Sequence, residues 1–216
     1  MQFDSNLQNL DDIAERKFSG LIDMTYNLIT TSLSLIEFKQ KIQYYGCHCW
    51  PNGKNEPGGK GTPIDPIDSV CRKNYRCKQC VDIDYPGQCD TNIGRYSWKI
   101  ENNEIICDSA NSPCQKSQCL CDKDFAENIA LHWDDATYNP FYWKHPTENT
   151  MPVTFNRDGT CSITGIGHEL DACCGEKYPQ RYPYSTERHD CCQSSGKLFD
   201  PSTFQCCSDG KVRPSC

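Results

Sequence analysis

The chain has 216 residues, of which 18 are cysteine, and its formal net charge at pH 7 is −7. This cysteine density is typical of secreted folds that disulfides hold together, and it argues against a reducing compartment. The acidic excess argues against nucleic acid as a partner and against avid binding to anionic membranes. No apolar run is long enough to span a membrane. The start lacks the basic and apolar regions of a signal peptide, so we expect a secreted protein whose signal peptide is not part of this sequence.

The cysteines fall into two sets. Ten lie between Cys47 and Cys121, eight lie between Cys161 and Cys216, and residues 122–160 contain none. The second half of that gap is rich in Pro, Asn and Thr, which is typical of a linker. We therefore expect a first domain over residues 1–150, with 15 basic and 21 acidic side chains, and a nearly neutral second domain over residues 151–216, with 7 and 8.

Apolar residues at three- and four-residue steps predict the first two helices. One is expected between Leu7 and Leu28, and a second, shorter helix between Leu33 and Ile42. Four Gly and three Pro make residues 50–63 a loop. A third helix is expected over residues 69–83, with Asp68 or Ser69 as its cap.

The next elements are a hairpin and a further helix. Tyr96, Trp98 and Ile100 alternate with polar residues, and residues 102–103 (Asn-Asn) suit a tight turn. Residues 104–107 then form the returning strand of a two-stranded hairpin. Another helix is expected over residues 114–130.

Several motifs carry a family resemblance. Residues 45–49 (Tyr-Gly-Cys-His-Cys) and 58–65 (Gly-Gly-Lys-Gly-Thr-Pro-Ile-Asp), followed by Asp68, resemble the calcium loop of secreted phospholipase A2. Cys71 and Cys77 match the cysteine spacing of that family's second helix.

The resemblance continues into the second half of the domain. Residues 96–108 resemble the β-wing of the family, and residues 114–122 resemble its third helix. The resemblance implies a mainly α, disulfide-rich fold. Its parts are two long antiparallel helices, a calcium-loop-like segment and a β-wing hairpin, followed here by a small Cys-rich tail domain.

The resemblance also implies four disulfides, each of which contributes about 2–4 kcal/mol. Cys47 and Cys80 have no assigned partner, so they pair with each other or with cysteines of the tail. Val70 and Trp98 stand where the family has further cysteines. The four implied pairs are Cys49–Cys71, Cys77–Cys121, Cys89–Cys114 and Cys107–Cys119.

The catalytic positions depart from the family. Its members hydrolyse the sn-2 ester of phospholipids with a His base, an Asp that orients this His, and an adjacent Asp that binds calcium. The flanking cysteines place Asn74 at the base position and Tyr75 at the metal position, whereas Asp122 matches the orienting Asp. Lys78 stands at a position where the family has Tyr. A neutral amide has no useful basicity near pH 7, and a phenol is not the carboxylate that calcium prefers. We therefore expect no catalytic residues, no enzyme activity and a structural role for Asp122.

The calcium-loop-like segment is also altered. Trp50 replaces the first loop Gly of the family, and about six additional residues separate it from the Gly-rich part that begins at Gly58. His48 lies within the same degenerate loop. We expect no cofactor, with calcium binding weak at most. By analogy Ile36, Phe38 and Trp50 line the entrance of the family's apolar channel; the alternative is ordinary core packing.

The tail contains an internal repeat. The adjacent pairs Cys173-Cys174, Cys191-Cys192 and Cys206-Cys207 are spaced by 18 and then 15 residues. Because neighbouring cysteines rarely bond each other, each pair ties its strand to two others and gives a ladder with little core. The pattern resembles the di-cysteine repeats of galaxin, a skeletal matrix protein.

Three functions follow as hypotheses. The first is a non-catalytic extracellular protein with a structural, matrix or binding role and a protein or matrix partner, as in the otoconin-like use of this scaffold in biominerals. The second is a weak or shifted calcium-dependent phospholipase A2. The third is a lipid- or receptor-binding module. Asn74, Tyr75 and the tail favour the first.

Overall fold

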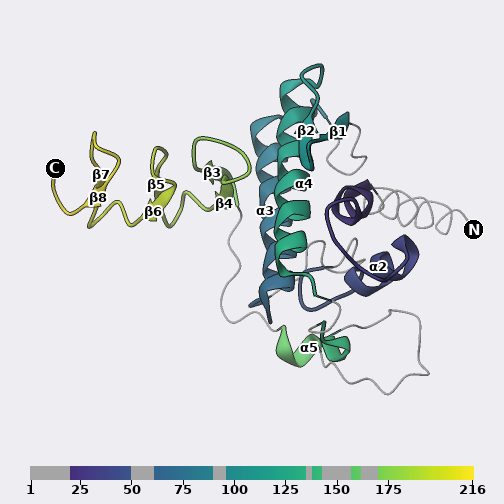
Figure 1. Cartoon of the computed structure of the whole chain (residues 1–216). Helices are drawn as coiled ribbons and strands as arrows, with labels where there is room; N and C mark the ends of the chain where they lie inside the picture. Colours follow the sequence, from purple (N-terminus) through teal and green to yellow (C-terminus); the bar gives the residue numbers. More distant parts are fainter. Residues whose placement is uncertain (1–19, 50–60, 90–95, 135–137, 143–156, 162–169) are drawn as a thin grey trace, which may run out of the picture.

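The structure is a computed structural model that describes residues 20–49, 61–89, 96–134, 138–142, 157–161 and 170–216. Residues 20–26 are helical, and the predicted mainly helical, disulfide-rich fold is confirmed (Figure 1). The linker expected near residue 150 and most of the helix expected from Leu7 lie outside the described residues. The further helical elements are α2 (Leu35–Ile42), α3 (Pro66–Asp84), α4 (Pro113–His132), the 3-10 turn η1 (Pro140–Tyr142) and α5 (Arg157–Thr160).

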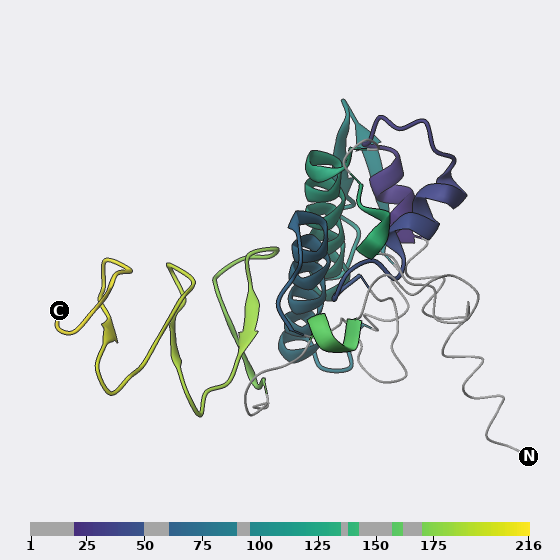
Figure 2. The same ribbon diagram turned by 90° about the horizontal axis from the view of Figure 1, so that it is seen from below.

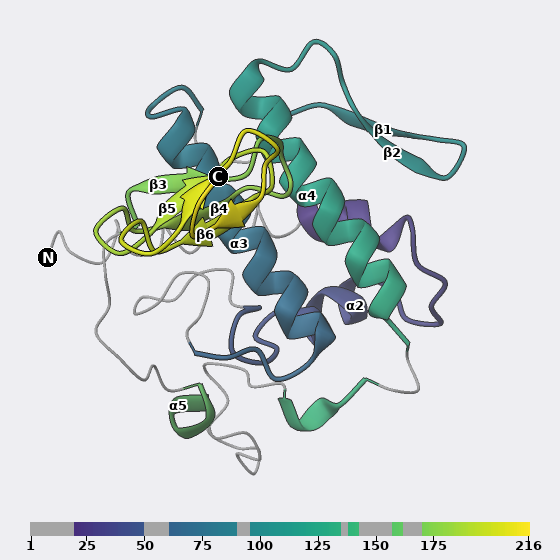
Figure 3. The same ribbon diagram turned by 90° about the vertical axis from the view of Figure 1, so that its left-hand side faces the viewer.

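The long helices α3 and α4 lie side by side and antiparallel, and the disulfide Cys77–Cys121 joins them (Figures 1 and 3). The predicted cap of α3 is wrong: the Asp65 side chain caps the helix by accepting from the Asp68 amide at 2.8 Å, and Pro66 occupies the first turn. A capping box of Ser112 and Gln115 begins α4.

The main core lies where residues 20–26 and α2 pack against α3 and the C-terminal half of α4. Phe38 is fully buried and meets Trp133 edge to face, with ring centroids 4.6 Å apart. The buried members of this core are Leu21, Ile22, Phe38, Ile42, Tyr45, Cys49, Ile67, Val70, Cys71, Phe125, Ile129 and Trp133.

None of the helices in the described part of the chain is long and apolar enough to cross a membrane.

The predicted hairpin is confirmed as β1 (Trp98–Glu101) and β2 (Glu104–Cys107), which pair antiparallel. Asn102 and Asn103 connect them with φ values of 51° and 65°. Both residues therefore take the left-handed conformation that a two-residue hairpin turn requires. Ile105 is fully buried against α4, and Cys107–Cys119 bonds the hairpin to that helix.

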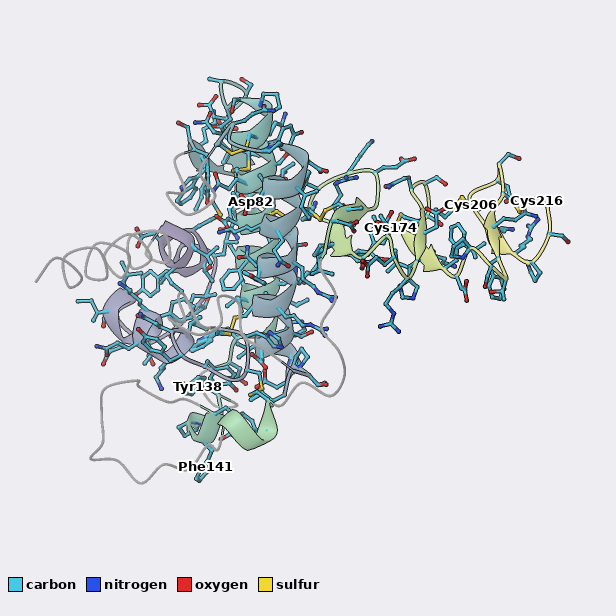
Figure 4. The ribbon with its side chains drawn as sticks, turned by 180° about the vertical axis from the view of Figure 1, so that it is seen from behind. Asp82, Tyr138, Phe141, Cys174, Cys206 and Cys216 are labelled. Atoms are coloured by element: carbon cyan, nitrogen blue, oxygen red, sulfur yellow. A yellow bond between two sulfur atoms is a disulfide. The ribbon has the colours of Figure 1, made fainter. Side chains whose placement is uncertain are left out.

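The tail is a row of three two-stranded hairpins that extends away from α3 (Figure 2). Adjacent cysteines bond different partners, as predicted, so each hairpin is tied to the next (Figure 4). The hairpins are β3 (Ala172–Cys174) with β4 (Tyr182–Tyr184), β5 (Asp190–Cys192) with β6 (Lys197–Phe199), and β7 (Gln205–Cys206) with β8 (Val212–Arg213). The bridges within the row are Cys174–Cys191, Cys192–Cys206 and Cys207–Cys216.

The first tail hairpin packs directly on α3. Cys80 of α3 bonds Cys173 of β3, and the Arg181 guanidinium donates to both carboxylate oxygens of Asp84 at 2.7 and 2.9 Å. Tyr178 donates to the same carboxylate at 2.6 Å. Because a disulfide and a bidentate ion pair act together here, the first hairpin is held against the helical domain.

Candidate functional site

The facing sides of α3 and α4 bring Asn74 and Asp122 into contact. The Asn74 amide donates to Asp122 Oδ1 at 2.9 Å and to the carbonyl oxygen of Cys121 at 3.0 Å. Both side chains are buried. The positions that the resemblance assigns to a base and to its orienting carboxylate are therefore neighbours in space.

Two further groups hold the Asp122 carboxylate. Lys78 lies one helical turn after Asn74, and its Nζ is 2.6 Å from Asp122 Oδ1; the two side chains are only 7% and 3% exposed. The Tyr96 hydroxyl donates to Asp122 Oδ2 at 2.6 Å. An amide, an ammonium and a phenol thus surround one carboxylate, and no imidazole is among the described groups bonded to it.

The electrostatics of this network keep the Tyr96 hydroxyl as a donor. Burial, and then the charge of Asp122, raises the pKa of Tyr96 well above its ordinary value, so the phenol keeps its proton. A buried carboxylate that lost its cation would bear an uncompensated charge. Lys78 is therefore the group that neutralises Asp122.

Tyr75 projects from α3 beside Asn74 and is half-buried. The Gln79 amide donates to its hydroxyl oxygen at 3.3 Å. Burial, followed by the charge of Asp82, raises the pKa of Tyr75, so this oxygen is neutral at physiological pH. Among the described residues, no three His, Cys, Asp or Glu side chains gather to hold a metal ion. The donors found at this position do not fit a calcium ion, which prefers carboxylate oxygens.

His48, in the loop, and Asp68, in the first turn of α3, belong to a different assembly. The Asp68 carboxylate accepts from the backbone amides of His48 and Ile64 at 2.6 and 3.0 Å, and the His48 ring Nε2 lies 3.1 Å from the Gly61 carbonyl oxygen. Gly46 has a φ of +57°, and a Cβ there would lie 2.5 Å from Asp68 Cγ. Burial raises the pKa of Asp68, and these backbone amides oppose the shift. The buried carboxylate therefore anchors the loop to the first turn of α3.

Of the residues assigned to an apolar channel, the two that the structure describes differ in exposure. Ile36 is 69% exposed, whereas Phe38 is fully buried in the main core. Trp50, like Gly58 of the loop, lies outside the described residues. The contacts of Phe38 are those of ordinary packing.

The disulfides are the four pairs implied by the resemblance, together with links to the tail segment. Cys47 and Cys80 do not bond each other. Cys47 bonds Cys161 and Cys80 bonds Cys173, so both pair with cysteines of the C-terminal part of the chain. The six bridges outside the row of tail hairpins are Cys47–Cys161, Cys49–Cys71, Cys77–Cys121, Cys80–Cys173, Cys89–Cys114 and Cys107–Cys119.

Sequence reasoning missed two partners of Asp122. Lys78 lies four residues after Asn74, a spacing that puts both on the same face of a helix, so the pattern did contain a signal for it. Tyr96 precedes the hairpin and reaches Asp122 only through the tertiary fold. The expected structural role of Asp122 named none of these contacts.

Comparison with known proteins shows the family of the chain. The phospholipase A2 family profile matches residues 25–143. Phospholipase A2 SSD387 of Scolopendra dehaani is 31% identical over 135 residues, which are 61% of this chain and 82% of that protein. The phospholipase A2 of Bos taurus is 32% identical over 57% of this chain and 75% of its own. The basic phospholipase A2 homolog acutohaemolysin of Deinagkistrodon acutus is 37% identical over 47% of this chain and 63% of its own. The chain belongs to the phospholipase A2 family.

Proposed function

We propose that this protein is a secreted, non-catalytic member of the phospholipase A2 family that serves as a structural or partner-binding scaffold. The observation that carries the proposal is the set of groups that bond to the Asp122 carboxylate. Its two oxygens accept from Asn74, Lys78 and Tyr96, so it holds an amide and an ammonium in place of an imidazole.

This arrangement lacks a group that can activate water. The Asn74 amide donates its protons to Asp122 and Cys121, and it has no lone pair of useful basicity. Loss of a general base costs about 10²–10⁴ in rate. Tyr75 stands where the family has a carboxylate that binds the metal, and this metal stabilises the developing oxyanion. Loss of that stabilisation lowers the rate by a further factor of about 10²–10³.

The tail supports a structural role. Its three hairpins extend from the helical domain, and disulfides link each to the next (Figure 2). Such a ladder is held together by covalent bonds because it has little apolar surface to bury. The resemblance to galaxin repeats favours a role in an extracellular matrix. A role in a biomineral matrix is the most specific version of this proposal.

Phospholipid hydrolysis tests the proposal. The purified protein, mixed with phosphatidylcholine vesicles and millimolar calcium, is expected to release fatty acid at least about 10⁴-fold more slowly than the bovine relative. Fatty acid would be measured by mass spectrometry with and without a chelator. Calcium-dependent release near the rate of the bovine enzyme would contradict the proposal and favour the second hypothesis, a calcium-dependent phospholipase.

A variant series gives the matched comparison. Asn74→His with Tyr75→Asp restores the residue types of the family, but Lys78 still holds Asp122. Adding Lys78→Tyr removes that competitor, so the triple variant is expected to exceed the double variant. Equal release by both variants would show that Lys78 does not restrain the carboxylate.

A further inference from the structure

The outer face of α3, opposite Asn74, takes part in a second site. There α3, the C-terminal end of α4 and the first tail hairpin enclose a groove of about 490 Å³. Cys80–Cys173 and the pairing of Arg181 with Asp84 hold the hairpin in place, so the groove exists only because the tail is docked. The residues that line it are Pro66, Ser69, Val70, Arg72, Lys73, Arg76, Asn128, His132, Pro179, Gln180, Arg181 and Tyr182.

The groove is strongly basic, although the chain as a whole carries a net charge of −7. Arg72, Lys73, Arg76 and Arg181 face it, and none of the described residues that line it is acidic. Two of these cations are neutralised from outside the groove, since Lys73 pairs with Asp124 at 2.9 Å and Arg181 with Asp84 at 2.7 Å.

Arg72 and Arg76 differ from the other two. No described residue forms an ion pair or a hydrogen bond with either guanidinium, although both side chains are half-buried. They lie one turn apart on α3, where like charges repel each other. Burial, and then the charge of Arg72, lowers the pKa of Arg76. An anion bound between the two guanidinium groups would compensate the cost of their burial and offset the repulsion between them.

The chemistry of that anion follows from the donors. A guanidinium presents a planar fork that matches the oxygens of sulfate and phosphate groups, and the polar residues Ser69 and Gln180 belong to the same lining. A pocket of this volume lies within the range of about 300–1,000 Å³ that holds small organic ligands. The site is also a concave corner between a helix and the tail on an acidic protein, which is unfavourable for a flat anionic bilayer.

We propose that this groove binds a soluble, sugar-sized ligand that carries several sulfate or phosphate groups, with Arg72 and Arg76 as its principal contacts. The proposal rests on the docked tail and the two arginines. It is independent of the absence of catalysis, so the failure of one proposal leaves the other standing.

Isothermal titration calorimetry on the full chain tests it, at about 0.15 M salt to screen weak surface attraction. The probes are sucrose octasulfate and inositol hexakisphosphate, with sucrose and inositol as uncharged controls. At least one charged probe is expected to bind with a Kd of about 0.1 mM or tighter, and the stronger of the two identifies the ester. Arg72→Gln with Arg76→Gln should weaken binding by about 100-fold, or tenfold for each lost guanidinium.

Lys116→Gln with Lys211→Gln is the matched control. It removes the same net charge from two exposed lysines outside the groove and is expected to leave the Kd unchanged. The single variant Arg72→Gln, on the outer face of α3, is expected to lose about tenfold and covers the case in which the double variant does not fold. Two results would overturn the proposal directly: no binding of either charged probe, or equal weakening in the control variant and in Arg72→Gln with Arg76→Gln. A third is tight binding to phosphatidylserine vesicles that is lost in Arg72→Gln with Arg76→Gln, because it would assign the site to a membrane.

Discussion

Replacing Lys78 with methionine is expected to lower the free energy of unfolding by about 3–5 kcal/mol. The substitution keeps most of the side-chain volume but leaves the Asp122 carboxylate, only 3% exposed, without its cation. Asn74 and Tyr96 still donate to it, but neither carries a charge. Urea unfolding followed by circular dichroism would measure the loss.

Two comparisons separate this effect from a general cost of removing lysine. Lys73→Met breaks the pair with Asp124, in which the lysine is 47% exposed, and is expected to cost no more than about 1 kcal/mol. Lys78→Met with Asp122→Asn removes both charges and should recover most of the stability. Similar losses for Lys73→Met and Lys78→Met, or no recovery in the double variant, would contradict the buried pair.

Replacing Cys80 and Cys173 together with serine is expected to undock the first tail hairpin. The bridge spans 93 residues of sequence, but Cys47–Cys161 already shortens the loop that it closes. For the few tens of residues that remain, we expect a loss of about 3 kcal/mol. Hydrogen exchange would detect it as faster exchange of amides in β3 and β4, with α4 unchanged.

The terminal bridge provides the control for this second prediction. Cys207–Cys216 closes only 9 residues at the far end of the tail, so replacing both cysteines with serine should leave exchange in β3 and β4 unaltered. Unchanged exchange in the Cys80→Ser/Cys173→Ser variant would mean that Arg181 and Tyr178, through Asp84, suffice to dock the hairpin.

The sequence predicts much of the fold because its signals here are local. The Asn-Asn turn fixes the hairpin register, and the apolar spacing between Leu33 and Ile42 places α2 to within a few residues. The cap of α3 could also have been predicted, since Pro66 favours the first helical position and therefore points to Asp65.

The rest depends on tertiary structure. The partners of Cys47 and Cys80 could not be deduced, because cysteine positions alone do not determine connectivity. The basic groove is likewise invisible in the sequence: Arg72 and Arg76 look like ordinary solvated residues until the tail hairpin forms the opposite wall. At the candidate site, only the spacing of Lys78 from Asn74 indicated the pair with Asp122.

A crystal structure of the protein grown in millimolar calcium tests the central claim most directly. We predict density for the Asn74 amide and the Lys78 ammonium within hydrogen-bonding distance of Asp122, with no ion beside Tyr75. A divalent ion coordinated in that cleft, next to an imidazole that contacts Asp122, would contradict the account.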